Sequence, residues 1–316
     1  MGNVRDIIQE ISDVRQRRQF GTAIAELPSR LSSINNAFSQ TTPDQHELRR
    51  YFPVALIGCL EGYFRMAIRD LIDSGEPFLS NADKLLESTK LDFSLVRAIH
   101  GKTITVGELI AHNVPLSRLA HIEKAFKSLI GADFLNELRT VQDRWAHEVL
   151  GQTARPILLV ADTVFKDVER TFELRHIICH EIASAYVIDA EEIARCFENC
   201  VLFLKAADEF ISGVLHPNAP LTQTEMNIAA GESLERARDE LNVAIENLRS
   251  NLDDEELAFF DQAQIQWLAY AEAWTLFEVG ERKNSGTIWP LLYARSQEYL
   301  VSKRVEDIRK WRRFGE

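Results

Sequence analysis

The sequence contains no run of about 18 apolar residues, which is the length that a membrane-spanning helix needs. Its first segment, from Gly2 to Arg18, is charged throughout and has no apolar centre of the kind found in signal peptides. We therefore expect no membrane partner and a cytoplasmic location.

Cysteine is scarce, and glycine-rich phosphate-binding loops are absent. The four cysteines, Cys59, Cys179, Cys196 and Cys200, form no CxxC pair, and a helical CxxxC is a weak zinc signal. Buried free thiols in a reducing compartment are the expectation. The sequence has no Walker-type or GxGxxG motif, so we expect no nucleotide or dinucleotide cofactor.

Basic residues are too few to balance the acidic ones. The net charge is −12, and residues 218–316 carry 12 basic and 18 acidic side chains, which leaves −6 for each part of the chain. This balance argues against a broad, non-specific coat of nucleic acid. It is compatible with a small basic groove inside an acidic surface.

Apolar residues recur at helical spacing almost everywhere, which predicts an all-α protein. The clearest example is Val54 to Ile72, where a wide apolar stripe predicts a buried helix with Glu61 and Arg65 as an i,i+4 pair. Further helices are expected at Leu116–Ile130, Phe134–Leu150, Leu158–Glu181 and Asp189–Leu215, the last with a capping box formed by Asp189 and Glu192. Shorter helices, with a β-leaning stretch at residues 103–106, predict a helical insertion between Ser80 and Gln152.

The segment from His216 to Pro220 is the strongest linker signal, because two prolines in five residues cannot continue a helix. We therefore expect a helical bundle with an insertion in residues 1–216, a linker in residues 217–221, and a small three- or four-helix bundle in residues 222–316. The helices of the second domain are expected at Gln223–Leu252, Asp254–Gly280 and Pro290–Arg313. Trp267, Tyr270, Trp274 and Trp289 are expected to lie mostly in its core, with one aromatic left for contact with a ligand or partner.

Arg175, His176 and His180 lie within six consecutive residues near the end of an expected helix. Histidine titrates near neutral pH and can move protons, whereas the planar guanidinium of arginine binds phosphate oxygens. Such groups can cleave RNA without a metal, by attack of its own 2′-hydroxyl on the phosphate.

Helical geometry limits this hypothesis. At about 100° per residue, Arg175 and His180 are roughly 140° apart around the helix, while His176 and His180 share a face. Convergence would need a curled arginine, a helix end near His180, or a second copy of the helix in a symmetric dimer. The two histidines also have the spacing of helical zinc ligands, but Ile177 stands where the zincin motif has glutamate.

Two stretches resemble the HEPN family, and specifically its RiboL-PSP type. They are Leu60-Glu61-x-Tyr63-Phe64 and, further on, Phe172-x-Leu174-Arg175-His176-Ile177-Ile178-Cys179-His180. The resemblance covers residues 5–215 and implies a homodimeric, metal-independent endoribonuclease whose two motifs meet at the interface. The products would carry 2′,3′-cyclic phosphate and 5′-hydroxyl ends.

The resemblance also implies a role for each residue. Arg175 would bind the scissile phosphate, and His180 would handle the proton of the 2′-hydroxyl. His176 would orient RNA or assist proton transfer, and Glu61 would hold Arg175 in place. The implied partner is RNA, and the implied biological role is that of a toxin or phage-defence effector.

Residues 221–312 resemble the LprI-like (DUF1311) domain through motifs in a fixed order. They are Thr222-Gln223-x-Glu225-Met226-Asn227, Leu241-Asn242, Gln264-x-x-Trp267-Leu268-x-Tyr270, Phe277-Glu278, Gly286-x-Ile288, Leu292-Tyr293 and Arg304. Ala229, Thr275 and Ser296 stand where the family's cysteines align. The basic side chains between Lys303 and Arg313 either lie on a solvated helix or steer RNA.

Three hypotheses follow. The first is a HEPN ribonuclease whose C-terminal domain senses a trigger or binds an antitoxin. The second is a non-catalytic HEPN dimer that acts as an interaction module. The third, a periplasmic lysozyme inhibitor, predicts the signal peptide and disulfide bonds that this sequence lacks.

Overall fold

The computed structural model describes residues 4–17, 23–42, 44–85, 93–101, 103–181 and 185–311. These residues contain fourteen α-helices and no β-strand, only an isolated bridge between Gln142 and Pro156. The all-α prediction is confirmed. The chain divides into two compact units, residues 1–217 and 218–316. None of the described helices is long and apolar enough to cross a membrane.

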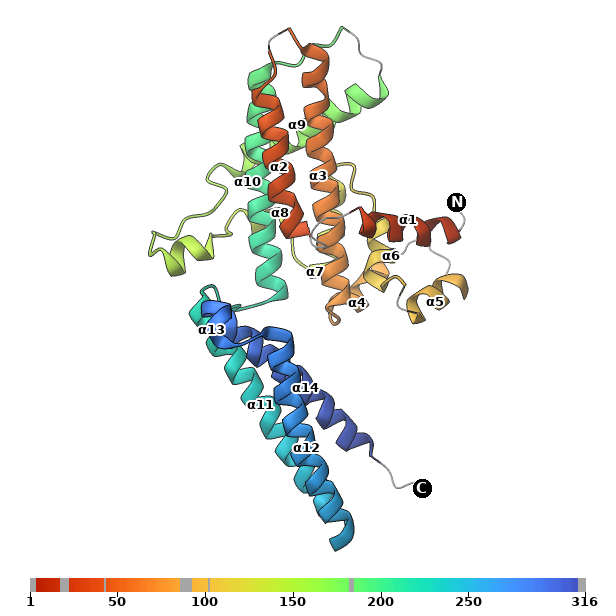
Figure 1. Ribbon diagram of the computed structural model, residues 1–316. Helices are drawn as coiled ribbons and strands as arrows, with labels where there is room; N and C mark the ends of the chain where they lie inside the picture. Colours follow the sequence, from red (N-terminus) through yellow and green to blue (C-terminus); the bar gives the residue numbers. More distant parts are fainter. Residues whose placement is uncertain are drawn as a thin grey trace. The chain divides into compact units, whose positions relative to one another are not determined.

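Four long helices form the body of the first unit. They are α2 (Ala23–Ser39), α3 (His46–Asp73), α9 (Ala161–His180) and α10 (Ala190–Leu215). The other three all pack against α3 (Figure 1). At the centre of the core, the ring of Phe64 in α3 lies 5.4 Å from that of Phe126 and 5.6 Å from that of Phe203. Phe64 is completely buried.

The apolar stripe predicted for α3 is buried from Leu56 to Leu71, and only Ala55 is half-buried. The helix nevertheless begins at His46, eight residues before the expected start, and continues through Pro53. Proline lacks the N–H that a helix interior needs and usually ends a helix. Here Pro53 is buried within the helix.

The insertion consists of short elements. They are α4 (Phe78–Asn81), η1 (Ala82–Leu85), α5 (Phe93–His100), α6 (Val106–Asn113), α7 (Leu119–Ile130), α8 (Phe134–Leu138) and η2 (Trp145–Val149). The single helix expected at residues 134–150 is wrong, because α8 ends after five residues and a π turn follows. The β-leaning stretch is wrong too, because Thr105 forms a capping box with Glu108 and starts α6.

Two smaller expectations also need correction. Asp189 caps α10 by accepting a hydrogen bond from the Glu191 N–H, while the Glu192 carboxylate accepts one from Arg170, so the expected capping box is absent. Three of the four cysteines are buried and free as expected, but Cys179 is exposed on the last turn of α9.

The second unit is a small helical bundle, as predicted. Its elements are α11 (Gln223–Arg249), α12 (Asp254–Val279), α13 (Arg282–Ser285), η3 (Gly286–Ile288) and α14 (Trp289–Lys310). Helix α14 packs against both α11 and α12. The aromatic core prediction fails for Tyr270 and Trp274, which are 51% and 41% exposed. Arg312 and Arg313 lie outside the described residues.

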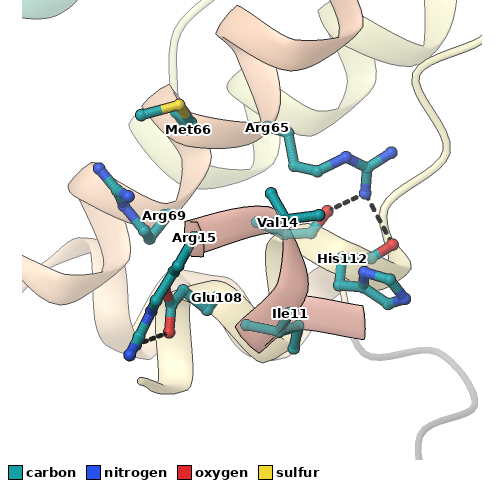
Figure 2. A pocket seen from close by; sticks show the side chains of 9 residues that line it. Ile11, Val14, Arg15, Arg65, Met66, Arg69, Glu108 and His112 are labelled. Carbon is teal, nitrogen blue, oxygen red and sulfur yellow. Dashed lines mark hydrogen bonds and ion pairs between the residues drawn. The ribbon is translucent and has the colours of Figure 1, made fainter. Parts of the chain in front are cut away.

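Two arginine contacts join helices of the first unit beside α3. Arg15 of α1 (Val4–Gln16) donates hydrogen bonds to Glu108 of α6, and Arg65 of α3 donates to the carbonyls of Ala111 and His112 at the end of α6 (Figure 2). Burial works to raise the pKa of Glu108, but the hydrogen bonds and charge of Arg15 outweigh it and lower the pKa. Pairing with Arg15 therefore favours the ionised carboxylate in the folded state.

This pair predicts a pH-dependent contribution to stability. A carboxyl whose pKa is lowered by folding stabilises the protein above its usual value of 4.5, and the contribution disappears as pH falls through the folded-state pKa. Glu108→Gln keeps the cap but removes the charge. Because Arg15 is partly exposed, we expect a loss of about 1 kcal/mol at pH 7 and almost none near pH 3, measured by urea unfolding. The control is Glu198→Gln on the exposed side of α10. An equal loss at both pH values would contradict the assignment.

Candidate functional site

The motif residues lie on the last two turns of α9. The inner face of this helix is anchored by Phe172 and Leu174, which are buried. This anchoring leaves Arg175 half-buried and His176 and His180 exposed. The rings of the two histidines are 5.1 Å apart, as residues four apart on a helix should be.

All three side chains line one open cavity of about 700 Å³. The cavity lies between the end of α9 and the start of α7, where Ser117, Arg118, Leu119 and Ala120 form its other wall. The remaining lining residues are Glu169, Phe172, Glu173, Ile177 and Glu181. Arg175 and His180 are expected to point about 140° apart around the helix, but both side chains line the same cavity. His180 is the last residue of α9, and a long arginine side chain can extend along the helix surface away from its own Cα atom.

The charges around the cavity are partly balanced by pairing. Glu173 accepts a hydrogen bond from Arg170 at 3.0 Å, and Glu181 lies 4.0 Å from the His176 ring nitrogen. Within the described ranges, by contrast, the side chains of Arg118 and Arg175 have no hydrogen-bond or ion-pair partner. The cavity therefore presents two guanidinium groups that are free to bind an anion.

Arg118 was not foreseen from the sequence. It is the N-cap residue of α7, but its side chain makes no capping hydrogen bond. The neighbouring Pro115 and Ser117 mark a helix start, yet nothing in the sequence places this position beside α9.

Glu61 lies elsewhere on the surface of the first unit. It is half-buried on α3, and its charge acts on Arg65, one turn further along the helix. It is not among the residues that line the cavity, and no contact between Glu61 and Arg175 is found in the described part of the chain. The proposed support of Arg175 by Glu61 stays a prediction.

A metal centre needs several ligands in one place. Among the residues that the structure describes, no group of three or more His, Cys, Asp or Glu side chains has the geometry to hold a metal ion. The pair His176 and His180 lacks a third ligand in that set.

In the second unit, α12 and α14 meet at a polar contact inside the bundle. The hydroxyl groups of Thr275 and Ser296 are 3.2 Å apart, and Gln297 donates a hydrogen bond to Thr275 Oγ1 at 3.0 Å. Thr275 is completely buried. Both positions are among those where we expect the cysteines of the LprI-like family to align.

Residues 217–308 match the family model described as "Lysozyme inhibitor LprI". The C-terminal unit is an LprI domain. The family comparison gives no match to a HEPN model. No curated protein and no solved structure matches the chain significantly.

The contact between Thr275 and Ser296 in the LprI domain predicts that a disulfide bond can be introduced. Thr275→Cys with Ser296→Cys places two thiols where the hydroxyls now touch. A disulfide bond can form between two helices without large backbone movement when the two β-carbons are about 4 Å apart. Closing this loop should raise the stability of the domain by roughly 3 kcal/mol.

The test is a thiol titration of the denatured, oxidised double variant, followed by thermal unfolding with and without reductant. We expect only the four native cysteines to react and a melting temperature that falls on reduction. Thr275→Cys alone is the control. Six reactive thiols would contradict the expected geometry.

Proposed function

We propose that the first unit is a metal-independent endoribonuclease of HEPN type. The observation that carries the proposal is the single open cavity shared by Arg175, His176 and His180, with Arg118 on its other wall. Two guanidinium groups without a carboxylate partner suit a phosphodiester, and two adjacent imidazoles suit proton transfer. The sequence resemblance to HEPN proteins supports the same chemistry.

In the proposed reaction, His180 removes the proton from an RNA 2′-hydroxyl, and the 2′-oxygen attacks the adjacent phosphorus. The bond from phosphorus to the 5′-oxygen breaks, and the leaving oxygen takes a proton, from His176 or from water. Arg175 holds the negative charge that builds on the phosphate oxygens. The products are a 2′,3′-cyclic phosphate and a 5′-hydroxyl end.

The proposal includes a homodimer in which the cavities of two copies meet. Each copy brings the carboxylates of Glu169, Glu173 and Glu181 as well as Arg118 and Arg175, so a second copy does not change the charge balance of the cavity. It would instead add a second wall, so that the arginine of one copy and the histidine of the other could act on the same phosphate.

Cleavage of single-stranded RNA should occur in EDTA and depend on these side chains. Arg175→Ala and His180→Ala should each lower the rate by at least about 100-fold, because each removes a group that acts in the transition state. Arg118→Ala should mainly raise KM, because it weakens binding of the flanking phosphate. The controls are Arg97→Ala and His100→Ala on α5.

Several results would contradict the proposal. Undiminished cleavage by His180→Ala would show that His180 does not take the proton of the 2′-hydroxyl. Inhibition by EDTA would favour a zinc site instead. Absence of cleavage by a folded dimer would favour the non-catalytic interaction module. Mixing Arg175→Ala with His180→Ala tests the composite site, since partial recovery of activity requires that one copy supplies the arginine and the other the histidine.

The family match favours a second candidate function for the second unit, which is inhibition of lysozyme. Its net charge of −6 would attract a basic enzyme. The purified chain, added in excess, should then slow the clearing of a bacterial cell-wall suspension by hen egg-white lysozyme. Arg175→Ala should inhibit as well as the unchanged protein, because it alters only the first unit. Clearing at the uninhibited rate would exclude this function for that lysozyme.

A further inference from the structure

Helix α12 carries an exposed aromatic stripe that no described helix covers. The stripe consists of Phe259, Tyr270, Trp274 and Phe277, which are 71%, 51%, 41% and 78% exposed. The rings of Tyr270, Trp274 and Phe277 form a ladder with centroid separations of 6.0 and 5.6 Å. Large aromatic groups are typical anchors of protein interfaces and are seldom left in water together.

The stripe is straight along the helix. At about 100° per residue, Phe259 and Phe277 point in the same direction, Tyr270 points about 20° from them, and Trp274 about 60° from them. The exposed small residues Ala263 and Ala273 lie on either side of this line. The helix has a second, separate face that packs against α14 through Ala271 and Thr275.

The charges on and beyond α12 are unequal at its two ends. Six acidic residues and no basic residue lie on the helix, and Asp254, Glu255 and Glu256 form its first turn. Gly280, Glu281, Arg282 and Lys283 follow its end, and Lys283 pairs with Glu281, which leaves Arg282 as the exposed positive charge. Within the described ranges, the exposed side chains of Asp254 and Arg282 have no ion-pair partner.

We infer that the aromatic stripe of α12 binds the same stripe of a second copy of the chain in antiparallel orientation. A parallel pair would place two acidic first turns together, whereas an antiparallel pair places each first turn at the opposite end of the partner's helix, where Arg282 follows. In the register centred on residue 268, Phe259 faces the Phe277 position of the other copy and Ala263 faces Ala273. The small alanines let the two helices approach closely.

The size of the stripe is sufficient for a weak specific dimer. From the usual burial of aromatic side chains and the exposed fractions above, the four rings of both copies would bury roughly 900 Å². A specific interface buries about 1,000 Å² or more, and the flanking charged residues add to the rings. This inference does not rest on the ribonuclease proposal, because it concerns only the second unit.

Cysteine cross-linking of the full chain tests both the contact and its direction. In a Cys179→Ser background, which removes the exposed native thiol, Ala263→Cys and Ala273→Cys are made as separate variants. Under mild oxidation a mixture of the two should give a disulfide-linked dimer on a non-reducing gel, and each variant alone should not. The two positions are about 15 Å apart along one helix, so only the antiparallel register brings them together.

A charge reversal serves as the matched control. Arg282→Asp should lower the cross-linking yield of the mixture several-fold, because it adds negative charge near the acidic first turn of the partner, and Arg282→Lys should leave the yield unchanged. Phe277→Asp should abolish the cross-link, and it should not unfold the helix, because Phe277 is exposed. Cross-linking of either cysteine variant alone would overturn the antiparallel register. Absence of a cross-link in the mixture would overturn the contact itself. A dimer formed through another surface would not bring positions 263 and 273 together, so it would not give this cross-link.

Discussion

Burial of α3 on most of its circumference is the constraint on which the first unit depends. Helices α2, α6, α9 and α10 all pack on it, and the ring of Phe64 contacts aromatic side chains from three other parts of the chain. Because α9 must turn its apolar side towards this core, the polar side chains of its last turns face outward. The candidate site is therefore a consequence of the packing of α3, although α3 contributes no residue to the cavity.

The helices could be predicted from the sequence where one face is continuously apolar, as in α3, α9 and α10. Their ends could be predicted for α10, which runs from Ala190 to Leu215, but not for α3, which begins at His46, because the ends depend on individual contacts. Glu192 has the spacing of a capping residue after Asp189, but in the folded chain it binds Arg170. Likewise, residues 134–150 have helical composition, yet the chain turns after Leu138 and adopts a different local structure.

The candidate site was only half predictable. Arg175, His176 and His180 are neighbours in the sequence, so their proximity needs no knowledge of the fold. Arg118 belongs to a different helix and reaches the cavity only because α7 lies beside α9. The angle of 140° between Arg175 and His180 describes the directions of their β-carbons in a straight helix. It does not account for a long side chain or for a helix that ends at His180.

The LprI domain holds α12 against α14 with a hydrogen bond between Thr275 and Ser296, at two of the positions where the family's cysteines align. A hydrogen bond does not restrict the unfolded chain as a disulfide does, so the folded domain must depend more on apolar burial. Helix α12 buries one side in the bundle and exposes aromatic groups on another, whereas helices with apolar residues on several sides are normally buried. Covering the exposed stripe with a second copy would supply this missing burial and would make the stability of the domain dependent on protein concentration.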